Sequence, residues 1–244
     1  MGAMFTIFRR ELAAYFTSPL AYVFIVIFLA LGGGLTFYLG AFLQAGQADL
    51  RGFFQFHPWL YLFLIPAIGM RLWAEERKSG SIEFLMTLPI STGQAVLGKY
   101  LAAWVFVGIA LALTFPMWIT VNYLGAPDNG VIVGAYVGSW LMAGAFLAVS
   151  ACISALTRNQ VIAFVLAAAI NFIFLMSGIE LVQAFFRGWA PRLVVDVVAS
   201  FSYLTNFQGF AQGVYDLRGV VFFVSLIGIT LFINTAVVEL KKGD

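Results

Sequence analysis

The chain has little charge and almost no histidine or cysteine, and each shortage excludes a class of site. Its 244 residues include one histidine, His57, and one cysteine, Cys152. Neither an intramolecular disulfide nor a site that needs two histidines of this chain can therefore form. Charged residues make up only 10% and the formal net charge is +2, which disfavours nucleic acid as a partner. No catalytic set or metal-binding cluster stands out, so we expect neither enzyme activity nor a cofactor in this chain.

Long apolar stretches dominate the sequence instead, since 62% of the residues are hydrophobic. Roughly 20 helical residues cross the hydrocarbon core of a bilayer. Barrel strands would be about 10 residues long with alternating polarity, and that alternation is missing. The sequence predicts one all-α integral membrane domain over residues 1–244 with six transmembrane helices. The predicted spans cover residues 20–43, 53–73, 95–121, 131–156, 161–186 and 220–238.

The distribution of lysine and arginine predicts the orientation of these spans, because cytoplasmic loops are enriched in both. With the N-terminus inside, nine basic residues lie on the cytoplasmic side: Arg9, Arg10, Arg71, Arg77, Lys78, Lys99, Arg158, Lys241 and Lys242. Four lie outside: Arg51, Arg187, Arg192 and Arg218. We therefore expect both termini in the cytoplasm.

Two segments outside the spans have amphipathic patterns. Residues 4–17 carry apolar side chains at spacings of three and four, namely Phe5, Phe8, Leu12 and Phe16. This pattern predicts an interfacial helix on the inner leaflet. In residues 187–219, polar side chains recur every four positions at Arg192, Asp196 and Ser200. We expect one or two short helices there, forming an extracytoplasmic re-entrant segment in the outer leaflet.

The loop at residues 74–94 carries charge and exposed apolar residues together. Ser81 can cap a short helix, and Pro89 can end it. Apolar side chains on a cytosolic loop need a partner or the membrane surface to cover them, so we expect a soluble partner to dock here. The candidate contact residues are Glu75, Glu76, Gly80, Ser81, Ile82, Glu83, Leu85 and Met86.

The stretch from Gly93 to Lys99 matches the first seven positions of a phosphate-binding P-loop, but the eighth position does not fit. Tyr100 stands where a serine or threonine must bind magnesium. The run also leads directly into an apolar span rather than following a strand. The chain is therefore not expected to hydrolyse ATP, and Lys99 is expected to be an interfacial cation.

Two polar residues fall at membrane depth, Asn171 in the middle of the fifth predicted span and Glu180 toward its outer end. Such residues usually face a bundle interior or a cavity. Asn171 either bridges to a neighbouring helix or lines a translocation path together with Glu180.

The stretch from Arg71 to Lys99 resembles the cytosolic loop of ABC-2-type permeases. The resemblance rests on residues 75–83, on Leu85, on residues 88–91 and on Gly98-Lys99. The six-span plan, the N-terminal helix and the outer segment are similar too, so the resemblance covers nearly the whole chain. Within that family the short external loops look most like the gliding-motility-type group.

The resemblance implies a set of partners. Two such membrane subunits pair, and two cytosolic ABC ATPase subunits, which use the ATP and magnesium, dock beneath them. Residues 75–89 would form the coupling helix that enters a groove on the ATPase. In the gliding-motility group a membrane-anchored subunit with an extracytoplasmic domain often accompanies the permease.

We therefore expect the membrane subunit of an ABC exporter in a bacterial inner membrane. Its substrate is unknown, and lipids and glycans are among the classes that relatives handle. Two alternatives remain: ATP-driven mechanical transmission to an extracytoplasmic partner without a soluble substrate, and a structural scaffold of a membrane complex. An ATPase gene next to this one would favour the exporter or mechanical transmission over the scaffold.

Overall fold

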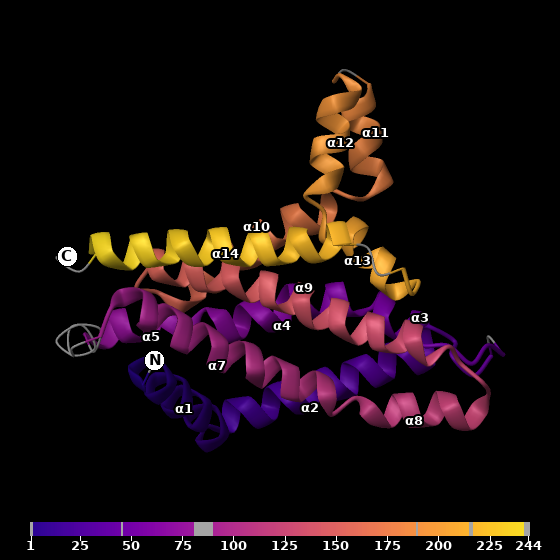
Figure 1. The fold of residues 1–244 in the computed structure, drawn as a ribbon, viewed down its shortest axis with the longest axis horizontal. Helices are drawn as coiled ribbons and strands as arrows, with labels where there is room; N and C mark the ends of the chain where they lie inside the picture. Colours follow the sequence, from indigo (N-terminus) through magenta and orange to yellow (C-terminus); the bar gives the residue numbers. More distant parts are fainter. Residues whose placement is uncertain (1, 45, 81–89, 189, 215–216, 242–244) are drawn as a thin grey trace.

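The computed structural model describes residues 2–44, 46–80, 90–188, 190–214 and 217–241. In this part of the chain the regular structure is helical throughout, with no strand. The long helices lie side by side along one axis (Figure 1). Together with their apolar composition, this confirms an all-α integral membrane protein.

Four helices of the described chain are long and apolar enough to cross a membrane. They are α2 Pro19–Gly34 with the π-helical η1 Leu35–Leu39, α7 Thr92–Ala112 with α8 Phe115–Leu124, α9 Asn129–Leu156, and α14 Leu217–Leu240. A fifth would be α10 Gln160–Met176 together with α11 Glu180–Arg187. The expected count of six spans stays a prediction.

The central helix is α9, because it packs against α4, α5, α7, α10, α13 and α14. Asp128 caps its start by accepting hydrogen bonds from the backbone N–H groups of Gly130 and Val131. The α9 sequence is rich in alanine, glycine and serine, and small residues allow neighbouring helices to approach closely. The buried core of the molecule is therefore built around α9.

The segment predicted as a span at 53–73 is divided into α3 Arg51–Gln55, α4 His57–Gly69 and α5 Arg71–Ser79. The hydroxyl of Ser154, on α9, stabilises the second break. It accepts hydrogen bonds from the backbone N–H groups of Trp73 and Ala74, at 3.1 and 3.0 Å, and donates to the carbonyl of Met70 at 2.8 Å. These are groups that a helix break leaves without intrahelical partners.

The segment predicted as a span at 161–186 is not one continuous helix. Helix α10 ends at Met176, and the chain turns by 71° before α11 begins at Glu180. Gly178 lies in this turn, where a Cβ atom would come within 2.1 Å of the Ser202 hydroxyl oxygen. The turn is therefore fitted closely against the start of the next packed helix, and a side chain at this position would force it open.

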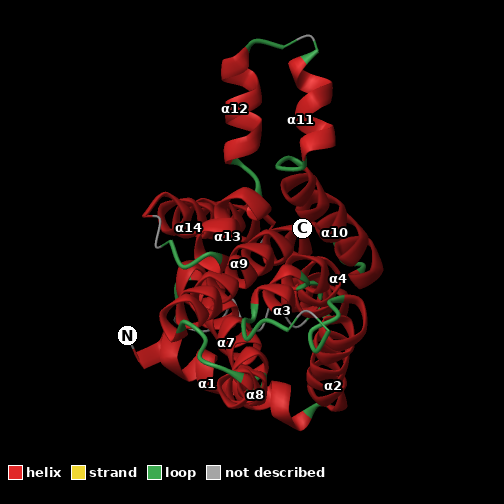
Figure 2. Ribbon diagram, turned by 90° about the vertical axis from the view of Figure 1, so that its right-hand side faces the viewer, coloured by secondary structure: helices red, strands yellow, loops and turns green. Residues whose placement is uncertain are grey.

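Beyond the turn, α11 and α12 Arg192–Ser200 form a hairpin that projects from the bundle (Figures 1 and 2). Helix α13 Tyr203–Ala211 then returns to α9, with the rings of Phe207 and Phe210 buried. The short helices expected in 187–219 are thus present. The hairpin, however, begins seven residues earlier than the predicted boundary, with α11.

Candidate functional site: the charged junction of α1, α5 and α7

The N-terminal helix α1, Gly2–Thr17, agrees with the helix predicted at 4–17. It ends where Ser18 caps α2 and Pro19 occupies the first turn of that helix. Helix α1 lies against α7 (Figure 1). The packed face is not centred on the predicted apolar stripe, since Ile7 is buried while Phe5 is 56% exposed.

Lys99 of α7 is the buried cation of this junction, with its side chain 4% exposed. Its ammonium lies 2.6 Å from a Glu76 carboxylate oxygen and 3.5 Å from a Glu11 carboxylate oxygen. The same ammonium lies 5.4 Å from the centre of the Trp73 ring. A buried charge is tolerated only when it is paired, and here the pairing ties α7 to both α1 and α5.

The position of Lys99 at the membrane interface stays a prediction, but its burial and its two ion pairs were not expected. The sequence signal that could have found this junction is the spacing of Ile7, Glu11 and Tyr15, which repeats every four residues and places the three on one helical face. A charged residue between two large apolar residues on a packed face predicts an internal ion pair. The predicted apolar face was instead that of Phe5, Phe8, Leu12 and Phe16.

The two glutamates of α5 have different environments. Glu76 faces Lys99, and its second carboxylate oxygen is buried without a hydrogen-bond partner in the described chain. Glu75 is about half exposed and accepts two hydrogen bonds from the Arg71 guanidinium, at 2.8 and 3.3 Å. These hydrogen bonds hold the pKa of the Glu75 carboxyl below its ordinary value. The predicted ATPase contacts of both residues stay predictions.

Helix α5 ends in a left-handed Gly80, with φ of 73°, a conformation that glycine adopts without strain. Its last turn is fixed to the core because the Arg77 guanidinium donates to the carbonyl of Ala155 at 2.6 Å. Five predicted contact residues lie outside the described residues: Ser81, Ile82, Glu83, Leu85 and Met86. The segment that contains them starts from a firmly held helix.

Helix α7 begins just as firmly on the other side of that segment. Ser91 accepts a hydrogen bond from the backbone N–H of Gln94, and the Gln94 side chain accepts one from the backbone N–H of Ser91. This reciprocal arrangement is a capping box, which satisfies two donors that a helix start leaves unpaired. The Gly93–Lys99 stretch therefore begins a capped helix instead of forming a loop around a phosphate.

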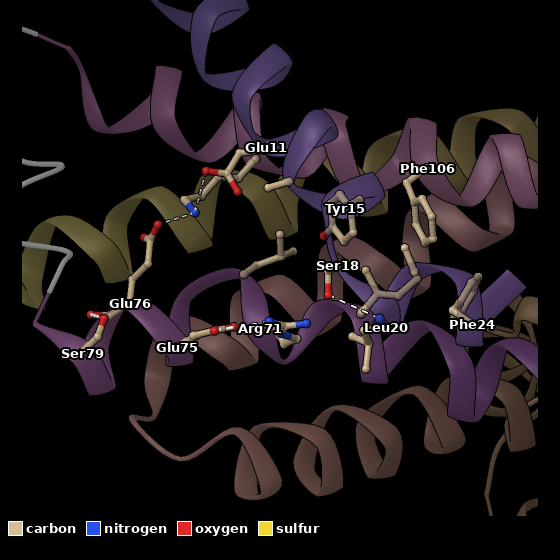
Figure 3. A pocket seen from close by; sticks show the side chains of 15 residues that line it. Glu11, Tyr15, Ser18, Leu20, Phe24, Arg71, Glu75, Glu76, Ser79 and Phe106 are labelled. Carbon is tan, nitrogen blue, oxygen red and sulfur yellow. Dashed lines mark hydrogen bonds and ion pairs between the residues drawn. The ribbon is translucent and has the colours of Figure 1, made fainter.

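A cavity of about 380 Å³ lies beside the junction, between α1, α2, α4, α5 and α7. Figure 3 shows the carboxylates gathered at one end: Glu11, Glu75 and Glu76. Aromatic rings line the other end: Tyr15, Phe24 and Phe106. Tyr15 stacks on Phe106 with ring centres 4.8 Å apart, and its burial, with the nearby Glu11 carboxylate, raises the pKa of its phenol.

The two candidate path residues lie on separate helices. Asn171 of α10 is fully buried, donates to the Ser150 hydroxyl at 3.2 Å and accepts from the Tyr203 phenol at 3.0 Å. Glu180 is exposed at the start of α11. These hydrogen bonds join α10 to α9 and α13, as expected if Asn171 bridges to neighbouring helices. A translocation role for the pair stays a prediction.

A second buried polar cluster, which the sequence did not predict, lies between α4 and α9. The Ser139 hydroxyl lies 2.7 Å from both His57 Nδ1 and the Tyr61 phenol oxygen, all inside the bundle. His57 is also surrounded by the rings of Phe28, Phe53 and Phe54. This cluster joins α4 to α9, and a lone histidine within an apolar stretch was its only signal in the sequence.

Comparison with known proteins shows the family to which the chain belongs. No curated protein matches it. The family described as "ABC-2 family transporter protein" matches residues 5–244, which is nearly the entire length. The match includes α5, α7, the segment between them, and α1 from Phe5 onward. The chain therefore belongs to the ABC-2 transporter family and is a multi-pass membrane permease subunit of an ABC transporter.

Proposed function

We propose that this subunit couples ATP hydrolysis by a cytosolic ABC ATPase to substrate movement through α5 and the segment that follows it. Family membership implies the ATPase partner. The observation that carries the proposal is the buried Lys99, which joins α5 to α1 and α7 through Glu76 and Glu11. A force applied beyond Gly80 would move α5, and α5 cannot move without disturbing α1 and α7.

The remaining contacts of α5 support the same role. Its start is bonded to Ser154 and its last turn to the carbonyl of Ala155, both near the end of α9. Interfaces and packed cores tend to switch between discrete arrangements rather than deform continuously. We propose that α5 shifts as a rigid element between two such arrangements, and that residues 75–89 contact the ATPase.

The topology that this role requires places both termini in the cytoplasm of a bacterial inner-membrane protein. Helix α1, the end of α5 and the C-terminal end of α14 lie at the same end of the bundle (Figure 1). Lys241 also donates to the carbonyl of Leu156, at 2.7 Å, which joins the ends of α14 and α9. The nine-to-four distribution of basic residues supports assigning this end to the cytoplasm.

The α11–α12 hairpin supports a second candidate, ATP-driven mechanical transmission to an extracytoplasmic partner. Large apolar side chains are exposed along it: Leu181 at 81%, Phe185 at 68% and Leu193 at 73%. Exposed apolar surface of this kind is covered by lipid or by another protein. A second permease copy and a membrane-anchored subunit with an extracytoplasmic domain are the proposed neighbours. The assignment to the gliding-motility-type group is part of this proposal.

The coupling proposal is tested by disconnecting the junction while leaving the segment between α5 and α7 intact. In a reconstituted permease–ATPase complex, Lys99→Met should retain the bound ATPase but remove the effect of the permease on the rate of ATP hydrolysis. Arg9→Met is the matched control, since Arg9 is an exposed cation of α1 outside residues 75–89. Unchanged stimulation in Lys99→Met would refute coupling through the junction.

A further inference from the structure

The cavity beside the charged junction has the two-ended chemistry of an amphiphile site. Charged side chains line one end, contributed by Glu11, Arg71, Glu75, Glu76 and Lys99. The other end is apolar, with contributions from Leu20, Ala21, Phe24, Ile68 and Phe106. A ligand with a small charged head and an apolar tail matches this division, since binding sites combine apolar walls with a few polar groups that set orientation.

The balance of charge selects a positively charged head. Three carboxylates and two cations line the cavity. Both cations already have partners, because Arg71 is paired with Glu75, and Lys99 with Glu76 and Glu11. The group left without a partner is an acceptor, the second carboxylate oxygen of Glu76, which is buried and unbonded in the described chain. An incoming head should therefore bring hydrogen-bond donors and positive charge.

The apolar end leads toward a surface that a lipid tail can follow. Leu20 lines the cavity and is 43% exposed, and Val23 and Ile27 continue from it along α2 at 52% and 39% exposure. These three residues are spaced by three and four, so they share one face of the helix. Only 28% of the apolar stretch within Pro19–Leu39 is buried inside the molecule. A tail leaving the cavity can lie along this face.

We propose that this cavity binds an amphiphile with a primary ammonium head, namely an aminophospholipid such as phosphatidylethanolamine. The ammonium would add donors to the carboxylates Glu75 and Glu76, and the tail would follow Leu20 and α2. A trimethylammonium head has the same charge but no N–H donors, so the site should prefer ethanolamine to choline. Placement in the inner leaflet follows from the proposed topology, whereas the preference among headgroups does not depend on ATPase coupling.

The experiment measures lipid binding to the purified full chain in detergent, by native mass spectrometry with lipids of identical acyl chains. Phosphatidylethanolamine should bind roughly tenfold more tightly than phosphatidylcholine or phosphatidylglycerol, since hydrogen bonds to charged groups contribute about that factor. Equal retention of the three lipids would overturn the proposal. This first comparison needs no variant.

Two variants locate the site. Ala14 lines the cavity and Ala13 does not, although both are exposed on α1. Ala14→Phe should therefore abolish the ethanolamine preference while Ala13→Phe keeps it. Glu75→Gln should weaken phosphatidylethanolamine binding about tenfold, with the exposed Glu239→Gln of α14 as its control. If the preference survives both cavity variants, the lipid binds elsewhere and the assignment to this cavity is wrong.

A soluble amphiphile distinguishes a membrane source from a cytosolic one. Dodecylammonium and dodecyltrimethylammonium carry the same tail and charge and differ in N–H donors. Tighter binding of dodecylammonium together with phosphatidylethanolamine supports the proposal. If only dodecylammonium binds to the cavity, the membrane lipid is overturned as the ligand.

Discussion

Replacing Lys99 by methionine isolates the contribution of the buried junction to stability. The side-chain length is nearly kept, but the ammonium that lies between two carboxylates is removed. Glu11 retains a partner, because its carboxylate also lies 2.7 Å from the Arg10 guanidinium. Glu76 loses the only ion pair it makes in the described chain, and its carboxylate is left poorly hydrated.

The expected loss in the free energy of unfolding follows from the unpaired Glu76 carboxylate. Removing one partner of a buried ion pair costs about 3–5 kcal/mol, and the Glu76 side chain is 19% exposed, so we expect the lower end, about 3 kcal/mol. Adding Glu76→Gln removes the uncompensated charge. The double variant should therefore be more stable than Lys99→Met alone, with a coupling energy of about 1–3 kcal/mol between the two sites.

The assay is reversible unfolding of the chain in mixed micelles, followed by the loss of helix signal, for the four members of the double-variant cycle. Lys78→Met is the surface control and should change the free energy of unfolding by less than about 0.5 kcal/mol. The reasoning is refuted if Lys99→Met costs less than about 1 kcal/mol, or if Glu76→Gln worsens that variant rather than relieving it.

Three further outcomes are expected. Cysteines introduced at Asp128 and Ser200 should react with an impermeant reagent in intact cells, and one at Ser79 only after permeabilisation; labelling of Ser79 from outside would reverse the topology. Glu75→Gln should destabilise the chain at neutral pH, and the difference should vanish as pH falls from 4.5 through the lowered folded pKa, as a pH series of unfolding curves would show. Ser154→Ala should cost about 1–3 kcal/mol in the same unfolding assay, because three backbone groups at the α4–α5 break lose their partner.

Helices whose hydrophobicity is continuous were predictable from the sequence. The span expected at 131–156 is α9, Asn129–Leu156, and the one expected at 220–238 is α14, Leu217–Leu240. The N-terminal helix was predicted within two residues at its start and ends at Thr17 as expected. In each case local periodicity or length decides the structure, so no knowledge of distant contacts was needed.

The helix breaks could not be predicted in the same way, because distant residues stabilise them. The α4–α5 break depends on Ser154, about 80 positions along the chain. The turn after Met176 depends on the close fit between Gly178 and Ser202. Apolar composition continues through both places, so hydropathy alone extends the spans across them.

The ion pairs of the charged junction were not predicted from the sequence. Glu76 was expected to contact an ATPase, which stays a prediction, and the structure places one of its carboxylate oxygens 2.6 Å from the Lys99 ammonium. The burial of Lys99 results from α1 folding back onto α7, a tertiary contact that spacing on α7 does not reveal. Glu11, which completes the junction, lies 88 positions from Lys99, and its only signal was its place between Ile7 and Tyr15 on one helical face.

The central claim, that an ATPase drives this permease through the segment after α5, is tested most directly at Leu85. Leu85→Asp would place an unpaired carboxylate in the proposed apolar contact, which costs far more than a change of charge at its rim. The account predicts that Leu85→Asp releases the ATPase from the purified complex, or leaves its hydrolysis unresponsive to the permease, while Glu83→Gln has a milder effect. Unchanged ATPase co-purification and unchanged hydrolysis in Leu85→Asp would contradict it.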